Sequence, residues 1–532
     1  MFVKYDSLAH NIVMTLTWLK ILVWLFYLFI FLLPWQTRWI VRDLHIWRPQ
    51  VPSGVERIWE YGRISLYSWD IIFLLLIIVS WPMIWREIKD LKIRNPKSEI
   101  LNNSQISNFK IIYLVLLCLS FLSIIWSSDK VLAAVWNARL LEGGLLWLLI
   151  KTIKPKLLGI FWSLTLAGAI QALWGIVQFF TQSTFANKWL GVAAHSLTQA
   201  GTSVILSGGE NWLRAYGGQV HPNVLGGLLV VTCLATIWLY FIEKSEIRNP
   251  KSEINPNDQK FSNFEFRYSN LKKIILFSLY IIQLAGLFFT FSRGAWLALG
   301  VSLIIWWWQS RCHPGRGSGI QKQIETQKAD SFLFLDSRLP LGHELEAEWR
   351  GNDSSRWRNV LIITTSVFII LSAVYYPLVQ TRIFGGGRLE QQSVEERVGS
   401  VKDSQSILAR VWWRGTGMDN YTVELQKIQP NLSPRFYQPV HNMFLLVFTE
   451  LGIVGLIIFI WLLWIGIRSL VLRHWIFVTF SNTQVTSSYW LVAIIITAMF
   501  DHYWWTIPSM FMLFWLILAL VNLESDTKIN IS

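Results

Sequence analysis

Runs of about twenty apolar residues recur along the chain and constrain its fold more than any other feature. Twenty residues of α-helix rise about 30 Å, which matches the hydrocarbon thickness of a bilayer. We therefore expect an all-α polytopic membrane protein, with residues 1–532 forming a single integral membrane domain of about twelve transmembrane helices. The expected spans cover residues 18–35, 66–85, 110–127, 132–150, 157–180, 222–242, 272–291, 294–309, 359–376, 442–467, 488–501 and 506–522.

The composition excludes the main soluble classes of protein. Hydrophobic residues make up 53% of the chain and charged residues 15%, whereas a soluble protein carries roughly a quarter charged residues. The net charge of +14 therefore does not indicate a basic nucleic-acid-binding surface, and we expect no nucleic-acid partner. The three cysteines predict neither a disulfide framework nor a metal site, since no CxxC or Cys/His cluster accompanies Cys118, Cys233 and Cys312.

The distribution of Lys and Arg predicts the orientation in the membrane, because these residues concentrate in cytoplasmic loops. With the N-terminus inside, the loops 86–109, 243–271 and 310–357 are cytoplasmic, and so is the C-terminus. The long loop 377–441, between the ninth and tenth spans, then lies outside. The loop 36–65 is an exception, since it carries five Arg on the expected outer side. The sequence RNPKSEI occurs at 94–100 and again at 248–254, and we interpret both copies as inserted linkers.

Polar and aromatic residues inside or beside the spans have structural interpretations. Arg139 and Glu142 lie three residues apart on one helical face, which favours an ion pair. Trp504 and Trp505, at the outer end of the last two spans, are interpreted as anchors at the headgroup level. Three glutamines are interpreted as interhelical hydrogen-bond partners, namely Gln171, Gln178 and Gln283.

Three segments on the expected outer face each carry a cationic or titratable residue at the edge of a span. Arg214 precedes the span at 222–242, Arg293 lies in the tight connection before the span at 294–309, and His441 precedes the span at 442–467. Each residue alone has an ordinary explanation, because arginines extend towards headgroups and a histidine can cap a helix. Their common level in the membrane favours one shared site.

Two arginines and a histidine at this level predict a particular chemistry. Guanidinium groups bind phosphate through bidentate, charge-assisted hydrogen bonds, and a neutral imidazole accepts a proton from a hydroxyl. We therefore expect a group transfer in which a lipid pyrophosphate leaves. Arg214 and Arg293 would stabilise the charge that develops on the leaving group, and His441 would activate the acceptor hydroxyl. No metal or other cofactor is expected, since no carboxylate cluster indicates one.

The expected outer loop 377–441 is long enough to form a lid over a cavity. Residues 389–410 predict an amphipathic surface helix that carries Glu395, Glu396, Arg397 and Arg410. A G-x-G sequence follows at 415–417, but it lacks the third glycine and the preceding strand of a dinucleotide site. We exclude nucleotide binding there.

Three sequence matches carry a resemblance to a known family. The first is Arg214 followed by GGxxxPN at 217–223, and the second is the SRGAW turn at 292–296. The third is GxGxxNY at 415–421, followed by His441-Asn442 and by ELGIxGL at 450–456. In these segments the chain resembles the bacterial O-antigen ligase and O-antigen polymerase superfamily, which consists of polytopic GT-C-type glycosyltransferases.

The resemblance implies that a glycan moves from undecaprenyl pyrophosphate to an acceptor hydroxyl on the periplasmic face of the inner membrane. It also implies inversion at the sugar carbon without metal or nucleotide. By motif, Arg214 and Arg293 would hold the pyrophosphate and His441 would act as the base. Four further residues match the surrounding pattern and are expected to support the site, namely Asn223, Asn420, Tyr421 and Asn442.

Several functions remain open within this resemblance. An O-antigen ligase, an O-antigen or polysaccharide polymerase and a protein O-oligosaccharyltransferase differ in whether the acceptor hydroxyl belongs to a lipid, a glycan or a protein. Protein glycosylation is the rarer use, so we favour the first two. A lipid-linked sugar transporter is the rival from another class, but it would place charges at the midplane in two repeated halves. The sequence shows no such halves.

Overall fold

The computed structural model describes residues 18–43, 59–93, 104–199, 201–242, 259–311, 343–385, 387–475 and 482–522. Both copies of RNPKSEI and Cys312 lie outside the described residues. The described chain is mostly helical. Its long helices are α2 (Ser68–Ile93), α4 (Ser104–Ser123), α5 (Lys130–Ile153), α6 (Leu157–Thr181), α7 (Pro222–Ile242), α8 (Gln259–Phe289), α9 (Arg293–Arg311), α11 (His343–Val374), α15 (Met443–Trp475), α16 (Asn482–Ala498) and α18 (Pro508–Val521).

The helices lie where the apolar runs predicted them. Among the described helices, seven contain a stretch long and apolar enough to cross a membrane, and these are α2, α5, α6, α7, α8, α11 and α15. Four shorter apolar helices cover Trp18–Leu32, Phe109–Ser123, Ser488–Ala498 and Pro508–Val521. Their length and composition are those of a membrane protein. The count of about twelve spans stays a prediction.

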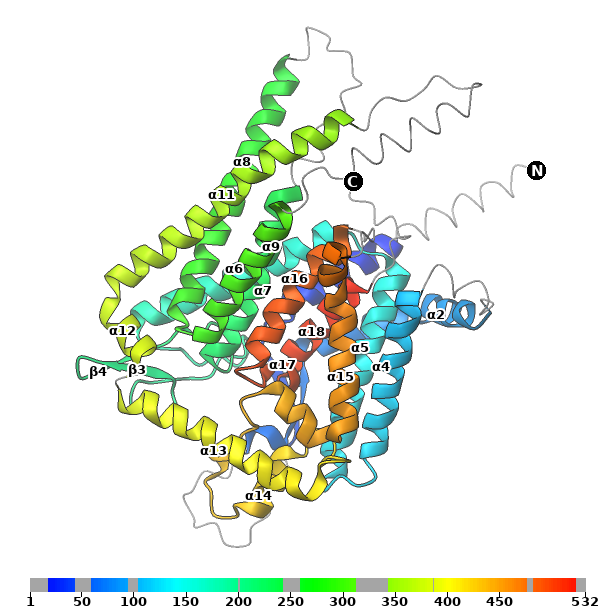
Figure 1. Ribbon diagram of the computed structural model, residues 1–532, viewed down its shortest axis with the longest axis vertical. Coiled ribbons are helices and arrows are strands. Elements are labelled where there is room, and N and C mark those ends of the chain that lie inside the picture. The colour runs from blue at the N-terminus through cyan, green and yellow to red at the C-terminus, as the bar shows by residue number, and fades with distance from the viewer. Residues whose placement is uncertain are drawn as a thin grey trace.

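The loop 377–441 folds into short helices at one end of the molecule. Its elements are α12 (Tyr376–Phe384), α13 (Arg388–Val411), α14 (Tyr421–Ile428) and the 3-10 turn η3 (Pro434–Phe436). The helix expected at 389–410 is therefore confirmed as α13. Of these elements, α13 and α14 lie at the lower end of Figure 1, whereas α8 and α11 extend beyond the bundle at the opposite end. We call the lower end the α13 end.

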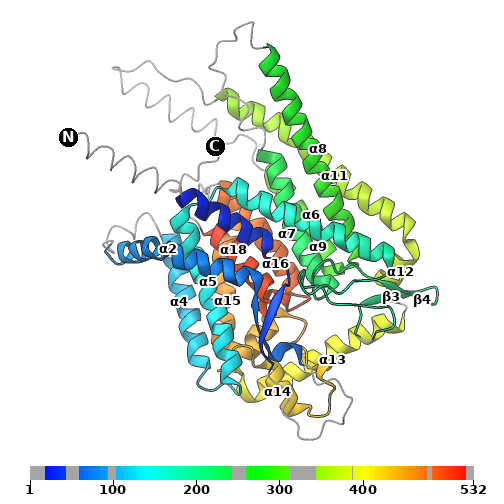
Figure 2. The same ribbon diagram turned by 180° about the vertical axis from the view of Figure 1, so that it is seen from behind.

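Two antiparallel hairpins depart from the all-α expectation. The strand β1 (Arg38–Asp43) pairs with β2 (Arg63–Tyr67), and β3 (Val204–Ser207) pairs with β4 (Glu210–Leu213). The turn between β3 and β4 consists of Gly208 and Gly209, both with positive φ, the conformation that two-residue hairpin turns require. In Figure 2 the blue strands β1 and β2 extend towards the α13 end.

In the first hairpin, two of the five arginines of the loop 36–65 pair with carboxylates. Arg63 donates to Asp43 Oδ1 at 2.8 Å and to Glu60 Oε2 at 3.0 Å, and Arg38 pairs with Glu60.

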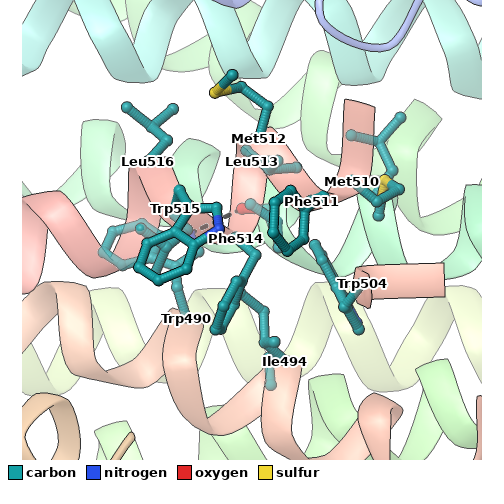
Figure 3. Packing of buried hydrophobic residues seen from close by; sticks show 14 of the residues in the cluster. Trp490, Ile494, Trp504, Met510, Phe511, Met512, Leu513, Phe514, Trp515 and Leu516 are labelled. Atoms are coloured by element: carbon teal, nitrogen blue, oxygen red, sulfur yellow. Dashed lines mark hydrogen bonds between the residues drawn. The ribbon is translucent and has the colours of Figure 1, made fainter. Parts of the chain in front are cut away.

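The centre of the bundle is apolar and dense in aromatic rings. Every residue of α18 from Ser509 to Val521 is buried, and Figure 3 shows its rings and methionines packed against α16 and α17 (Tyr503–Thr506). Trp504 and Trp505 belong to this core, since both are almost fully buried. An interfacial anchor faces lipid, so our interpretation of these two residues is wrong.

Polar side chains tie the helices together. The predicted pair of Arg139 and Glu142 is present at 3.0 Å, and Arg139 also binds the carboxylate of Asp70 in α2. Gln283 of α8 donates to Thr236 Oγ1 of α7 at 3.0 Å, as expected of an interhelical partner.

The other two glutamines, Gln171 and Gln178, both belong to α6 and bind a loop rather than a helix. Gln171 Oε1 accepts from the backbone of Gly218 at 2.7 Å, and Gln178 donates to the carbonyl of Gly217 at 2.8 Å. They hold the segment that follows β4 and leads into α7. Sequence spacing could not distinguish these backbone partners from helical ones.

The helix α15 is broken at Gly452, whose φ is 71° and ψ is −176°. The break leaves backbone groups without helical partners, and the segment after α13 supplies replacements. Thr416 N donates to Thr449 O at 2.9 Å, Gly417 N to Glu450 O at 2.8 Å, and Ile453 N to Trp412 O at 3.0 Å. The glycines at 415 and 417 therefore permit a close crossing of two backbones.

Candidate functional site

Four residues from distant parts of the chain form a connected set, which we call the polar chain. Arg214, after β4, donates from Nη2 to Asn223 Oδ1 at 2.8 Å. Asn223, in the first turn of α7, donates from Nδ2 to Asp501 Oδ2 at 3.0 Å. Asp501 Oδ1 lies 3.6 Å from His441 Nδ1, just before α15. The structure therefore brings predicted residues together through Asp501, which follows α16.

The turn between α8 and α9 positions Arg214. The backbone N–H of Ala215 donates to Phe289 O at 2.9 Å, and Arg214 Nε donates to Thr290 O at 2.7 Å. Arg214 Nη1 donates to Ser203 Oγ at 2.6 Å. Arg214 is thus held by the residues that directly precede the SRGAW motif at 292–296.

The charge of Arg214 is buried and is balanced by no direct carboxylate partner among the described residues. Its side chain is only 4% exposed in relative terms, and its three acceptors belong to a carbonyl, a hydroxyl and an amide. Burial, and then the nearby Arg382, lower the pKa of Arg214 well below its usual range. Because a guanidinium nonetheless keeps its proton in proteins, an anion nearby would stabilise this arrangement.

A pocket of about 290 Å³ opens beside the polar chain. Asn223 and Asp501 line it, together with Arg293 at the start of α9. Two more arginines reach it from the loop 377–441, namely Arg382 on α12 and Arg397 on α13. Its other lining residues are Ser292, Gly294, Ala295, Leu297, Thr497, Phe500 and Tyr503. Arg214 and His441 lie behind this lining, each one contact away from it through Asn223 or Asp501.

A buried carboxylate bridges two of the pocket arginines. Glu390, in the first turn of α13, lies 3.3 Å from Arg293 Nη2 through Oε2 and pairs with Arg382 through Oε1. Arg382 Nε also donates to Phe291 O at 2.9 Å. Burial lowers the pKa of Arg382, and Glu390 offsets part of that effect. The start of α13 is thus fastened to α9 by an anion held between two guanidiniums.

Asp501 lies among imidazoles. Burial alone would raise its pKa, but His441, His502 and His221 together lower the pKa of Asp501 well below its usual range, so the carboxylate is ionised. Burial lowers the pKa of His502 to about 4 despite the neighbouring Asp501, so this imidazole is neutral at neutral pH. His441 Nδ1 is buried and, at 3.6 Å from Asp501, has no hydrogen-bond partner in the described part of the chain.

The other expected supporting residues hold the surrounding elements. Asn420 exchanges two hydrogen bonds with the backbone of Asp129, at 2.7 and 3.0 Å, and thereby fixes the start of α5. Tyr421 Oη lies 3.1 Å from Ser404 Oγ and joins α14 to α13. Asn442 donates to Met499 O at 3.0 Å, which connects the start of α15 to the segment of Asp501. These contacts are structural, and none of the three residues lines the pocket.

Several residues of the site were not predicted. Asp501 is the last residue of the expected span 488–501 and His502 directly follows it, so the criterion that selected Arg214, Arg293 and His441 would also have selected them. Arg382 and Glu390 carry no such signal, because they lie within a long loop where no apolar run fixes their level. Arg397 was expected only as a charge on a surface helix.

Comparison with known proteins gives one match. Residues 349–460 match the family model described as O-antigen ligase, and this segment contains Arg382, Glu390, Arg397 and His441. No curated protein matches the chain. The match covers a minority of the 532 residues, but it includes the loop that supplies one wall of the pocket. It confirms the resemblance and supports assignment of the chain to the O-antigen ligase superfamily, a family of membrane glycosyltransferases in polysaccharide biosynthesis.

Proposed function

We propose that this protein transfers a glycan from undecaprenyl pyrophosphate to an acceptor hydroxyl on the outer face of the bacterial inner membrane, with inversion and without a metal. One observation carries the proposal. The buried, unneutralised Arg214 lies directly behind a pocket that three further arginines line, and His441 is linked to the same pocket through Asp501.

The arginines fit the leaving group. Arg293, Arg382 and Arg397 face the pocket, while Asp501 and Glu390 are the carboxylates in or against it. The excess of positive charge favours a pyrophosphate, and guanidiniums bind phosphate oxygens in a bidentate manner. Their charge stabilises a transition state in which the pyrophosphate gains negative charge as the sugar leaves it. Arg214 adds its charge from behind Asn223.

The histidine fits the base. The ionised Asp501 faces His441 Nδ1 and favours a proton on that nitrogen, which leaves Nε2 with a lone pair. Nε2 accepts the proton of the acceptor hydroxyl as its oxygen forms a bond to the anomeric carbon. The bond from this carbon to the phosphate oxygen breaks, and the electron pair leaves with the pyrophosphate. Attack from the face opposite the leaving group inverts the configuration.

The outward orientation rests on the charge distribution in the loops. The expected cytoplasmic loops at 243–271 and 310–357 connect at the end of α8 and α11 that lies opposite the α13 end (Figure 1). The site elements α13 and the start of α15 belong to the α13 end. With Lys and Arg inside, the pocket faces the periplasm.

The candidate functions differ in the class of molecule that carries the acceptor hydroxyl. We favour an O-antigen ligase or a polysaccharide polymerase, whose acceptor is a lipid or a glycan, over a protein O-oligosaccharyltransferase. The pocket beside α9 provides for the donor pyrophosphate in all three cases. The loop 377–441 is the element that we expect an acceptor to approach, since it contributes Arg382 and Arg397 to the pocket lining.

Purified protein in nanodiscs tests the proposal directly. We would supply a polyprenyl-pyrophosphate glycan with a labelled sugar and a panel of lipid, glycan and peptide acceptors, in the presence of excess chelator. A new glycosidic product with one acceptor class supports the proposal and identifies the acceptor. If no product forms, movement of the unaltered lipid across the membrane of vesicles that contain the same purified protein would instead support the transporter.

A further inference from the structure

Three potential metal ligands converge at the end of the polar chain. His441, Asp501 and His502 each offer one ligand atom, and these atoms all lie within 4.8 Å of one another. Asp501 Oδ1 lies 3.6 Å from His441 Nδ1 and 3.8 Å from His502 Nε2. Around a tetrahedral zinc ion with bonds of about 2.0–2.1 Å, ligand atoms are roughly 3.3–3.4 Å apart. Movements of a few tenths of an ångström bring both imidazoles to that distance from the carboxylate.

The surroundings of the three ligands already orient them. Asn223 donates to Asp501 Oδ2 at 3.0 Å, while Oδ1 accepts from the backbone N–H of His502 at 2.8 Å and is the oxygen turned towards both imidazoles. Thr506 Oγ1 lies 2.7 Å from His502 Nδ1, which leaves His502 Nε2 directed at Asp501. Hydrogen bonds of this kind fix the tautomer and the ring orientation of metal-bound histidines. His441 Nδ1 is buried without a hydrogen-bond partner among the described residues, so it is available as a third ligand.

We propose that His441 Nδ1, Asp501 Oδ1 and His502 Nε2 form a binding site for a divalent transition metal ion such as Zn²⁺, with a fourth position left for water. Two imidazoles and one carboxylate suit ions of this class, whereas Mg²⁺ prefers an octahedron of oxygens. Arg214, which supplies the guanidinium of the polar chain, is separated from Asp501 by the amide of Asn223.

Occupation of this site switches off the base, a consequence that rests on the proposed function. A zinc ion on Nδ1 holds the proton of the neutral imidazole on Nε2. That nitrogen then has no lone pair for the proton of the acceptor hydroxyl. The transfer itself needs no metal. Zinc acts as a reversible inhibitor because it binds His441 and Asp501.

Zinc binding is tested on the purified full-length protein by competition with a fluorescent zinc chelator. We expect one zinc ion per chain at neutral pH, binding weakened at least about tenfold in His502→Gln, and unchanged binding in the matched control His195→Gln. His195 lies in the 181–203 segment, stacked on Tyr216 and apart from the cluster. Absence of binding by the wild type, or equal affinity in both variants, would overturn the site. If His502→Gln does not purify as a folded protein, X-ray absorption of the zinc-loaded wild type decides. Two imidazole nitrogens are expected around the ion, and fewer would overturn the site.

The inhibitory consequence has a separate readout. Transfer by the wild type should fall at least tenfold when the zinc site is saturated and recover with chelator, while His502→Gln should resist the same zinc concentration. Equal inhibition of His502→Gln would refute inhibition through this site, even if zinc binds there. A protein that binds zinc in the expected manner but transfers no glycan would refute the proposed function and leave the metal site standing.

Discussion

Asn223 joins two opposite charges, and this role fixes the orientation of its amide. Its Oδ1 accepts from the guanidinium of Arg214 and its Nδ2 donates to the carboxylate of Asp501. No other residue type of the same size provides an acceptor on one side and a donor on the other. The amide also separates the two charges, which would otherwise neutralise each other. Arg214 thus keeps its charge for the pocket, and Asp501 keeps its charge for His441.

Changing Asn223 to Asp should therefore break the connection between Arg214 and Asp501. The new carboxylate neutralises Arg214 and repels Asp501, so the positive charge behind the pocket is lost. We expect the rate of transfer to fall about 10²-fold, comparable to the loss of one donor that stabilises a developing anion. Initial rates with a labelled lipid-linked glycan measure this. Asn211→Asp, on the exposed strand β4, is the matched control and should retain activity. A wild-type rate in Asn223→Asp would contradict the coupling.

Glu390 holds two pocket arginines in the way a phosphate group would hold them. In Glu390→Gln, Arg293 and Arg382 lose their shared anion, and so they should bind inorganic pyrophosphate several-fold more tightly. The apparent melting temperature should drop, because the buried Arg382 is left without a counter-ion. Inhibition of transfer by pyrophosphate and thermal unfolding measure the two effects. The exposed Glu395→Gln on the same helix should change neither, and unaltered pyrophosphate inhibition in Glu390→Gln would refute the comparison.

At the scale of residues, position relative to an apolar run decided what could be predicted. Arg214, Arg293 and His441 each precede such a run, and the structure connects all three to one pocket. Their chemical roles stay predictions. Arg382 and Glu390 meet Arg293 only because α12 and α13 fold back onto α9, and no local pattern in a long loop encodes that return. Position at the end of a span also led to a wrong prediction for Trp504 and Trp505. They are buried in the core, because residues at the end of a span need not face lipid.

At the scale of elements, the break in α15 organises the site from one side. Glu450, two residues before the break at Gly452, accepts from Trp505 Nε1 at 2.8 Å, and Trp505 lies three residues after His502. The segment 412–417 forms hydrogen bonds with the backbone groups around Gly452 that the break leaves without helical partners. The sequence of α15 from Met443 to Ile467 is apolar except for Thr449 and Glu450, so hydropathy predicted one continuous helix there. The two hairpins were missed for a similar reason, because strands of four to six residues beside long apolar runs leave a weak signal.

Gly452→Ala tests the break. Its backbone conformation is essentially restricted to glycine, and an added Cβ would lie 2.4 Å from the carbonyl oxygen of Trp413. We expect a loss of about 1–3 kcal/mol from the backbone conformation alone, with more from the clash. A lower apparent melting temperature of the purified protein would show this. Gly300→Ala, in α9 with nothing within 4 Å of the added Cβ, is the matched control and should be neutral or stabilising. Equal melting temperatures for the two variants would contradict the tight crossing.

At the scale of the whole molecule, buried imidazoles make stability depend on pH. Burial lowers the pKa of His502 to about 4 and that of His221 to about 3, whereas an imidazole in the unfolded chain titrates near about 6.5. Between these values the unfolded state binds protons that the folded state does not. The stability contributed by the neutral imidazoles is therefore complete above about pH 6.5 and is lost as the pH falls, at up to about 1.4 kcal/mol per pH unit for each group.

We accordingly expect the apparent melting temperature to fall between pH 7 and pH 5, and His502→Gln to show a shallower fall than the wild type. Thermal unfolding of both proteins across this range measures the difference. A melting temperature that stays constant or rises on acidification would show that these imidazoles are not buried in their neutral form.

The most direct measurement of the central claim is the rate of glycan transfer by purified His441→Ala, compared with the wild type and with His195→Gln. If His441 is the base that the polar chain serves, His441→Ala should lose transfer by roughly 10²–10⁴-fold while it inserts and purifies normally, and His195→Gln should keep the wild-type rate. Wild-type transfer by His441→Ala would contradict the account, because the imidazole beside Asp501 would then have no part in the reaction.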